Sequence, residues 1–305
     1  MSNKFELDSD MGGSFPYKSN FLEINDQKLA YIDEGPKDAP VLLMIHGNPT
    51  WSYLYRHFIE EYSGKYRCVV PDHIGFGRST KPTSMEEYSL QGHIDNLTKP
   101  VNHLDLKNVF PVGQDWGGPI ALGWASHNKE RVGGLVILNT WAFVKRFTMN
   151  LPIFFRVLFR SRLLGKWTAV NRNMFVNRII PFGIHRKENI KPDFDTMMKA
   201  YKAPFPNKKD RIGIRAFPRM IPSKESHPEW NTMLEIEEAL NEWEIPALLF
   251  TCTKDVAFSK EVANIFHQIL PNSNQPIEIV AGHFCQEEAM SDIFPPLSSF
   301  LSENN

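Results

Sequence analysis

The chain has 305 residues, of which 42% are hydrophobic, 12% aromatic and 23% charged. This is the composition of a folded globular protein, and it excludes disordered, collagen-like and coiled-coil classes. The 34 Lys and Arg residues nearly balance the 35 Asp and Glu residues, giving a net charge of −1. Because no overall positive field results, nucleic acid is not an expected partner. One α/β domain with an insertion explains this length as well as two domains do.

The cysteines and the apolar stretches predict a cytoplasmic protein without a membrane anchor. Cys68, Cys252 and Cys285 are odd in number and far apart, so neither a disulfide framework nor a zinc site is expected, and we predict three buried thiols. Residues 1–10 carry charges where a secretion signal needs an apolar run. The most apolar stretch, 151–164, is interrupted by arginines and is shorter than the ~20 residues that span a bilayer.

Short apolar runs alternate with longer segments of helical pattern, which predicts an α/β fold on one eight-stranded, mostly parallel sheet flanked by helices. The first two runs flank a polar turn and predict an antiparallel hairpin at the sheet edge. The other six are apolar throughout, as strands buried on both faces are. Pro111 makes the fifth expected strand, 109–112, a weaker prediction, because proline has no N–H to donate to a neighbouring strand. The expected strands are 21–24, 29–32, 41–45, 68–70, 109–112, 135–138, 247–250 and 277–280.

The strand pattern stops after the sixth expected strand. Residues 141–222 are rich in Arg, Phe and Pro and contain helix-like stretches at 154–164 and 193–201. We therefore predict a helical cap, 141–222, inserted into a core domain that is formed by 1–140 and 223–305.

The expected cap is strongly basic. Between residues 141 and 220 there are 18 Lys and Arg against 4 Asp and Glu, a difference of +14. Solvated helix faces are the simpler interpretation. The alternative is a surface that, with Phe154, Phe155, Phe159 and Trp167, contacts a membrane surface or an acidic partner.

Asp115 lies in a Gly-x-Asp-x-Gly turn, Gly113 to Gly117, between an expected strand and the helix-like stretch 119–125. This is the pattern of a nucleophile elbow with aspartate in place of serine. The glycines suit a strained strand-to-helix turn that lifts the side chain clear of the sheet. By itself, Asp115 fits a surface N-cap equally well.

Three further groups favour the elbow. Asn48 lies in His-Gly-Asn-Pro directly after the third expected strand, where this layout places its oxyanion donors. Asp255 follows the seventh expected strand and His283 the eighth. Nucleophile, acid and histidine in this order, each at the carboxyl end of a strand, predict the α/β-hydrolase fold with Asp115, Asp255 and His283 as catalytic triad.

These motifs resemble those of the haloalkane dehalogenase family of the α/β-hydrolase superfamily, and the resemblance covers nearly the whole chain. The segments that carry it are 46–56, 71–79, 113–118, 218–222 and 281–287.

The resemblance implies a role for each matching position. Asp115 corresponds to the nucleophile of the family, His283 to its base and Asp255 to its acid. Asn48 and Trp116 match its two halide-binding positions. No cofactor and no metal are implied.

Some family members carry the acid after the sixth strand instead. That position is Asn139 here, and an amide cannot serve as the carboxylate. The chain is therefore similar to the branch with an Asp-His-Asp triad and an Asn–Trp halide pair.

The chemistry of an aspartate nucleophile favours the same activity. Attack on an ester would give an anhydride, whereas a partly desolvated carboxylate displaces a leaving group from saturated carbon. Trp116 and Asn48 could donate to the departing halide. Water activated by His283 would then cleave the ester on Asp115, and the backbone N–H groups of Asn48 and Trp116 would bind the oxyanion. The expected partners are a small lipophilic substrate, water and halide; the sequence indicates no particular oligomeric state.

Other activities remain open. β-Lactone decarboxylases resemble the same branch, and there Asp115 would open a long-chain β-lactone to give an olefin and carbon dioxide. An epoxide hydrolase needs cap phenols, of which Tyr201 is the one clear candidate. A coelenterazine-type luciferase also resembles this scaffold. A catalytically silent binding protein would have no need of an intact triad. Five histidines show no metal-ligand spacing: His46, His57, His73, His93 and His103.

Overall fold

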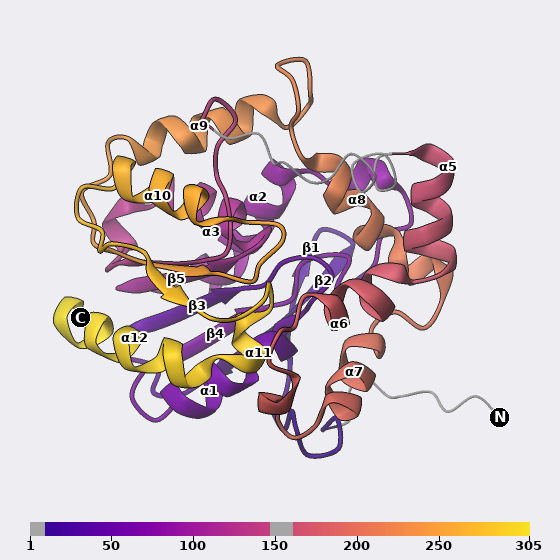
Figure 1. The fold of residues 1–305 in the computed structure, drawn as a ribbon, viewed down its shortest axis with the longest axis horizontal. Helices are drawn as coiled ribbons and strands as arrows, with labels where there is room; N and C mark the ends of the chain where they lie inside the picture. Colours follow the sequence, from indigo (N-terminus) through magenta and orange to yellow (C-terminus); the bar gives the residue numbers. More distant parts are fainter. Residues whose placement is uncertain (1–9, 147–160) are drawn as a thin grey trace.

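The computed structural model describes residues 10–146 and 161–305. Its centre is one eight-stranded sheet of order β1-β2-β4-β3-β5-β6-β7-β8 (Figure 1). All eight expected strands are confirmed, because runs of Val, Ile and Leu are buried on both faces of a sheet covered by helices. The strands are β1 (Asn20–Ile24), β2 (Gln27–Glu34), β3 (Val41–Ile45), β4 (Arg67–Pro71), β5 (Val109–Gln114), β6 (Leu135–Leu138), β7 (Ala247–Cys252) and β8 (Ile277–Ile279).

The hairpin at the sheet edge is confirmed, with a tighter turn than expected. β1 and β2 pair antiparallel with Ile24 opposite Gln27, which leaves Asn25 and Asp26 as the turn. Asn25 has a φ of 54°, a left-handed conformation that asparagine tolerates better than most residues. β2 is antiparallel to β4, and the remaining pairs are parallel.

Pro111 lies within β5, opposite Leu43 of β3. The carbonyl of Val109 accepts a hydrogen bond from Gly133 on the β6 side. Backbone groups alternate between the two sides of a strand, so Pro111 also faces β6. The ladder between β5 and β6 begins only at Val112. The N–H that proline lacks is therefore not needed for that ladder.

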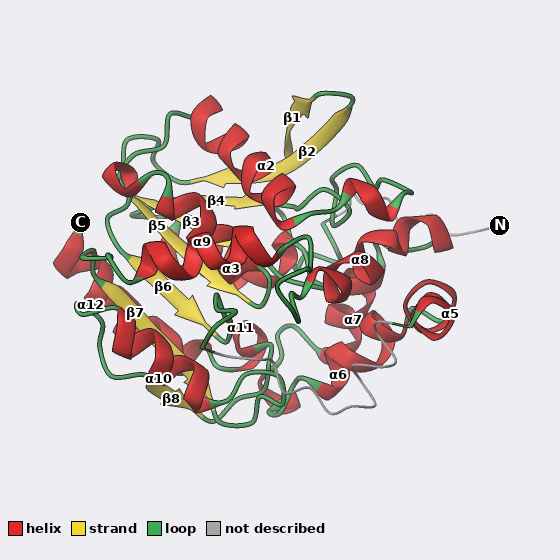
Figure 2. Ribbon diagram, turned by 90° about the horizontal axis from the view of Figure 1, so that it is seen from above, coloured by secondary structure: helices red, strands yellow, loops and turns green. Residues whose placement is uncertain are grey.

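Helices cover both faces of the sheet (Figures 1 and 2). In α10, Val262, Phe266 and Ile269 are buried at a spacing of i, i+4 and i+7, the repeat of a helix packed on one face. α1 and α12 lie on one face, and α2, α3, α9 and α10 on the other. Their bounds are α1 (Arg56–Tyr62), α2 (Leu90–His103), α3 (Gly117–Ser126), α9 (Trp230–Leu240), α10 (Lys260–Ile269) and α12 (Met290–Asn304), with the short α11 (Cys285–Glu288) before the last.

The described helices between β6 and α9 lie at one end of the sheet (Figures 1 and 2). The expected helix at 193–201 is confirmed as α7, where the Asp193 carboxylate caps the N-terminus by accepting the Thr196 N–H at 2.8 Å. The expected helix at 154–164 lies outside the described residues except for its last four. The helices here are α5 (Arg162–Gly165), α6 (Ile180–Phe182), α7 (Phe194–Lys202) and α8 (Ile212–Met220), with π-helical segments at Lys166–Asn171 and Phe175–Ile179.

The division into a core (1–140 and 223–305) and a cap (141–222) stays a prediction. Within residues 10–146 and 161–305, no helix is long and apolar enough to cross a bilayer. Cys68, Cys252 and Cys285 are buried free thiols, as expected. Burial raises the pKa of Cys68 from 9.0 to about 12.

Candidate active site

Asp115 follows the last residue of β5, two residues before α3 begins, and has a strained backbone conformation. Its φ is +52°, the left-handed region that costs a non-glycine residue energy. Two backbone hydrogen bonds and one from a side chain stabilise this turn. The Asp115 N–H donates to the Asn139 carbonyl at 3.0 Å, and its own carbonyl accepts from the Gly118 N–H at 3.1 Å and from the Thr140 hydroxyl at 2.5 Å.

Two glycines are required by close approaches at this turn. A Cβ at Gly117 would lie 1.9 Å from the backbone oxygen of Ile45, so α3 could not begin so close to the end of β3. A Cβ at Gly47 would lie 2.3 Å from Oδ1 of Asp115. Glycine at these two positions therefore leaves the space in which the carboxylate stands.

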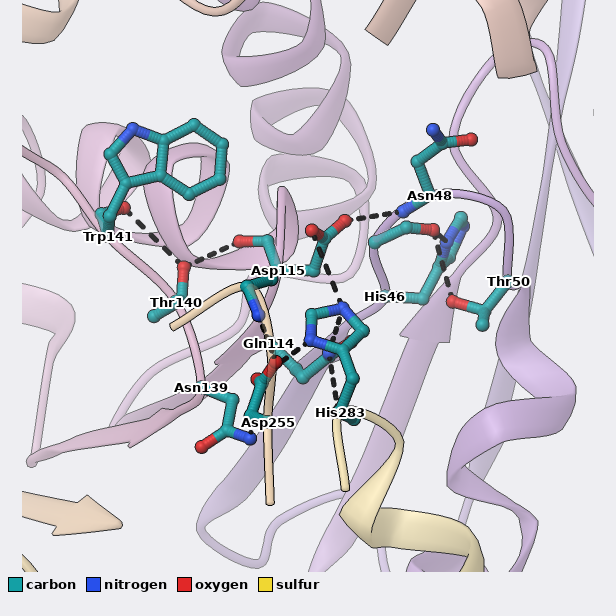
Figure 3. A network of polar contacts seen from close by, with 12 residues as sticks. His46, Asn48, Thr50, Gln114, Asp115, Asn139, Thr140, Trp141, Asp255 and His283 are labelled. Carbon is teal, nitrogen blue, oxygen red and sulfur yellow. Dashed lines mark hydrogen bonds and ion pairs between the residues drawn. The ribbon is translucent and has the colours of Figure 1, made fainter. Parts of the chain in front are cut away.

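The structure brings the three expected triad residues together (Figure 3). Nδ1 of His283 lies 2.8 Å from Oδ2 of Asp255, and Nε2 of the same ring lies 3.7 Å from Oδ2 of Asp115. The side chains of Asp115, His283 and Asp255 are 15%, 10% and 0% exposed. A carboxylate, an imidazole and a second carboxylate thus form a nearly buried row.

Asn139 holds the buried carboxylate of Asp255. Its Nδ2 donates to Oδ2 of Asp255 at 2.9 Å, and its Oδ1 accepts the Cys252 N–H at 2.9 Å. The other oxygen of Asp255 accepts the Ala257 N–H at 2.7 Å. Sequence analysis excluded Asn139 as the acid and gave it no other role. The sequence signal that could have indicated such a role is the position of Asn139, a polar residue at the carboxyl end of β6.

Gln114 is a second amide that sequence analysis missed. It is fully buried, and its Nε2 lies 3.0 Å from the carbonyl oxygen and 3.1 Å from Nε2 of His283. An amide nitrogen only donates, so the ring nitrogen in this contact accepts. The contact therefore favours the neutral imidazole with its proton on Nδ1.

The pKa of His283 is raised to about 10. Burial alone lowers the pKa, but the carboxylates of Asp255 and Asp115 together outweigh burial and favour the charged ring. Gln114 and Asp115 thus favour opposite protonation states at Nε2 of His283. Loss of the negative charge on Asp115 shifts the balance toward the neutral ring.

Asn48 contacts Asp115 through its backbone and the cap region through its side chain. Its N–H donates to Oδ1 of Asp115 at 2.7 Å. Nδ2 donates to the Ile214 carbonyl of α8 at 3.3 Å, and Oδ1 is buried without a partner in the described part of the chain. Figure 3 shows the amide directed away from Asp115. The side-chain amide that we expected to act as a donor in the site therefore already donates one hydrogen to α8.

Trp116 is 2% exposed, with its ring edge-on to Trp141 at 4.8 Å and to Phe217 at 5.4 Å. Its indole N–H forms no hydrogen bond with any residue that the structure describes. The indole N–H of Trp116, the residue after Asp115, is thus available to donate a hydrogen bond to a ligand. Unlike the Asn48 N–H, the backbone N–H of Trp116 forms no hydrogen bond with Asp115 here.

Three neutral histidines are buried behind the Asn48 loop. His46 donates from Nδ1 to the Gly47 carbonyl at 2.9 Å and accepts the His73 N–H at Nε2 at 3.0 Å. Both nitrogens of His93 lack partners among residues 10–146 and 161–305, and its ring lies 4.8 Å from that of Phe217. Burial lowers the pKa of His46 to about 3 and the pKa values of the other two well below 6.5.

A cavity of about 1070 Å³ lies elsewhere, between the 12–17 segment, α1 and the 188–192 loop, and contains no triad residue. Charged and polar side chains line it together with apolar ones, and it adds nothing to the chemistry of Asp115. In the described ranges, His, Cys, Asp and Glu side chains form no group of three or more placed to hold a metal ion.

Comparison with known proteins identifies the family. Residues 40–289 match the model of the alpha/beta hydrolase fold. The haloalkane dehalogenase of Mycolicibacterium paratuberculosis is 34% identical over 281 residues, covering 90% of this chain and 89% of that protein. The cis-3-alkyl-4-alkyloxetan-2-one decarboxylase of Xanthomonas campestris pv. campestris is 32% identical over 284 residues, covering 90% and 93%.

Solved structures agree. The tetrameric haloalkane dehalogenase of Paraglaciecola agarilytica is 30% identical and superimposes with a TM-score of 0.79 over 94% of both chains. The chain therefore belongs to the α/β-hydrolase superfamily and, within it, to the family of the haloalkane dehalogenases.

Proposed function

We propose that the protein hydrolyses the carbon–halogen bond of haloalkanes, giving an alcohol and a halide through an ester on Asp115. The observation that carries this proposal is the asymmetry of the Asp115 carboxylate. Oδ1 is held by the Asn48 N–H, whereas the one polar contact of Oδ2 in the described part of the chain is with Nε2 of His283 at 3.7 Å. One oxygen is thus fixed, and the other is placed to attack.

In the first step, Oδ2 of Asp115 forms a bond to the saturated carbon, and the carbon–halogen bond breaks with its electron pair going to the halide. Because the site is nearly buried, a hydrogen-bond donor directed at the developing negative charge stabilises it more than the same donor would in water. We assign this role to the indole N–H of Trp116 and to the amide hydrogen of Asn48 that Ile214 does not use.

In the second step, the ester no longer carries the negative charge of Asp115, so the pKa of His283 falls and Gln114 favours the neutral ring. Nε2 of His283 takes a proton from water, and the hydroxide adds to the ester carbon. The oxyanion forms at Oδ1, where the Asn48 N–H already donates. Collapse expels the alkoxide, which His283 protonates, and the new carboxylic acid of Asp115 releases its proton to solvent, which regenerates the carboxylate. Asp255, held by Asn139, keeps the ring oriented.

The test is to trap the ester. His283→Phe should react once with 1,2-dibromoethane and stop, because no base activates water. Intact-protein mass spectrometry should show one alkyl adduct per chain that maps to Asp115, with one equivalent of bromide released. Asp115→Asn is the control and should stay unmodified. An unmodified His283→Phe protein that nevertheless binds the substrate would contradict the mechanism.

β-Lactone decarboxylation is the second candidate, favoured by relatives of that name at nearly the same identity. In this reaction Oδ2 of Asp115 would attack the saturated ring carbon bonded to the ring oxygen, and the bond between that carbon and the oxygen would break to free a carboxylate. Loss of carbon dioxide would then supply the electron pair of the new C=C bond, and Asp115 would leave. This route consumes no water, so it does not need His283 as a base.

One side-by-side assay separates the two reactions. Bromide and alcohol from a brominated alkane with the wild type, and bromide without alcohol turnover with His283→Phe, support the dehalogenase. Carbon dioxide and olefin from a cis-β-lactone, in both the wild type and His283→Phe, support the decarboxylase. A wild-type protein that turns over neither substrate would contradict both.

A further inference from the structure

Exposed apolar side chains gather on the outer end of the segment between β6 and β7. Leu163, Leu164 and Trp167 are 80%, 49% and 53% exposed. They lie on α5 and on the π-helical segment that continues it, and Leu163 and Trp167 are four residues apart, a spacing that puts them on one helix face. Both ribbon views place α5 at the far end of the molecule from the sheet (Figures 1 and 2). Such a cluster on a soluble protein marks an interaction site.

Cations lie beside these apolar side chains. A groove of about 630 Å³ is lined by Trp167 and Met174, by Arg172, Arg178 and Lys202, and by two asparagines, and no carboxylate lines it. None of the three cations forms an ion pair with an acidic residue of the described chain. Arg172 only stacks on Trp167, 5.4 Å from its ring centroid. The groove therefore offers three positive charges, without a carboxylate partner among residues 10–146 and 161–305, next to exposed apolar surface.

We define the basic–apolar face by three apolar and three cationic residues: Leu163, Leu164, Trp167, Arg172, Arg178 and Lys202. We propose that this face docks on an anionic lipid surface. The leucines and the indole enter the acyl region, and the cations pair with lipid phosphate groups. The excess of +14 over residues 141–220 adds long-range attraction. Phe154, Phe155 and Phe159, which the alternative interpretation of the sequence included in this surface, lie outside the described residues.

Lipid fits this face better than a second copy of the chain. Two copies joined face to face would bring unpaired arginines and lysines together without any carboxylate between them, and like charges repel. Nucleic acid would satisfy the cations but would leave the two leucines in water. Only a surface that offers phosphate above hydrocarbon satisfies both kinds of side chain.

The docking is independent of the proposed reaction, because no residue of the face contacts Asp115, Asp255 or His283. Its use would be to hold the protein where lipophilic substrates concentrate. A failure to bind lipid would therefore leave the proposed activity untouched, and the reverse also holds.

Sedimentation with vesicles tests the proposal. The full chain should pellet with phosphatidylglycerol vesicles, stay in the supernatant with phosphatidylcholine vesicles, and be released by moderate salt. Reversing the charge of Arg172, Arg178 and Lys202 to Glu should weaken the apparent affinity roughly tenfold or more. Replacing Leu163, Leu164 and Trp167 by Ser should weaken it at every salt concentration.

Two control variants carry changes outside 141–222. One reverses three positive charges, as the cation variant does, and the other replaces an exposed apolar residue, as the apolar variant does. Lys65→Glu/Lys99→Glu/Lys107→Glu and Phe21→Ser should bind like the wild type. Turnover of a water-soluble haloalkane should be equal in all variants, which verifies folding. Equal recovery in the supernatant with and without vesicles, or full binding by the charge-reversed variant, would overturn the proposal. Self-association that the reversal abolishes, without vesicle binding, would also overturn it.

Discussion

At the scale of single residues, two amides govern the charged groups of the site. Asn139 donates to Asp255, and Gln114 contacts the ring and carbonyl of His283. Motifs for catalysis point to groups that carry charge or attack, so the triad was predictable and its two amide partners were not. Their function depends on which atoms they meet across neighbouring strands.

Asn139→Gly should slow the hydrolysis step about tenfold, equivalent to about 1.4 kcal/mol. The variant removes one donor from the buried Asp255 carboxylate, and glycine tolerates the φ of 35° at this position. Stopped-flow kinetics should show an unchanged burst of halide followed by a slower steady state. Asn25→Gly, a left-handed asparagine in the β1–β2 turn, is the control and should behave like the wild type. A smaller burst with unchanged hydrolysis would contradict the assignment.

The two chemical steps should depend on pH differently. With Asp115 ionised, the pKa of His283 is about 10, so the ring is protonated near neutral pH, and the displacement step does not require its base form. Alkylation of Asp115 removes one of the charges that raise this pKa. In single turnovers between about pH 6 and pH 9, ester formation should stay constant while ester hydrolysis accelerates with pH. A hydrolysis midpoint at or above that of the free protein would contradict this account.

At the scale of elements, the positions of the strands could be predicted from local sequence. The orientations of the side chains in the site depend on contacts with residues far away in the chain. Each buried strand is a short apolar run, so its composition identifies it. Pro111 is tolerated in β5 because the ladder between β5 and β6 begins only at Val112. The orientation of the Asn48 amide depends on Ile214, 166 residues away, and no local pattern encodes that contact. The same holds for the histidines buried between the Asn48 loop, α2 and α8.

The buried histidines should make the protein sensitive to acid. Unfolded histidine has a pKa near ~6.5, whereas the pKa of folded His46 is about 3 and those of His73 and His93 are also low. Their contribution to stability is therefore full above about pH 6.5 and is lost as the pH falls below that value, for His46 down to about pH 3. Each should contribute a slope of about 1.4 kcal/mol per pH unit in that window.

His93→Phe should remove one such slope, and it should not destabilise the protein at neutral pH, since both ring nitrogens lack partners. Urea unfolding at about pH 7.5 and about pH 5.5 measures the difference. The exposed His103 provides the control, and His103→Gln should keep the wild-type dependence. An unchanged pH slope in His93→Phe would show that this ring is not kept neutral by burial.

At the scale of the whole molecule, a buried ion pair links α1 and α11 to the segment between β6 and α9. Arg56 of α1 places its two terminal nitrogens 2.6 Å from the two oxygens of Glu287 in α11. It also donates to the Lys191 carbonyl at 2.8 Å, and the Tyr201 hydroxyl of α7 donates to Glu287. The neighbouring Glu288 accepts backbone N–H groups from both parts. The loop that carries His283 is thereby part of the attachment.

Arg56→Met should cost about 3–5 kcal/mol of unfolding free energy, because Glu287 would remain buried without a counter-charge. The double variant Arg56→Met/Glu287→Leu should recover most of that loss. Lys145→Met, which removes an ion pair with Glu238 that is exposed on both sides, should cost less than about 1 kcal/mol. Urea unfolding of the four proteins, wild type included, is the measurement. A double variant less stable than Arg56→Met would show that the pair itself is strongly favourable.

The anchoring of Oδ1 of Asp115 by the Asn48 N–H has an isotopic consequence. If the carboxylate does not rotate between turnovers, the oxygen that leaves in the alcohol is always Oδ2, and the oxygen that replaces it comes from the water of that turnover. A protein moved into ¹⁸O-water should release its first alcohol unlabelled and its second fully labelled. A rotating carboxylate would give a half-labelled second product. Each alcohol would thus carry the oxygen of the water consumed in the turnover before it.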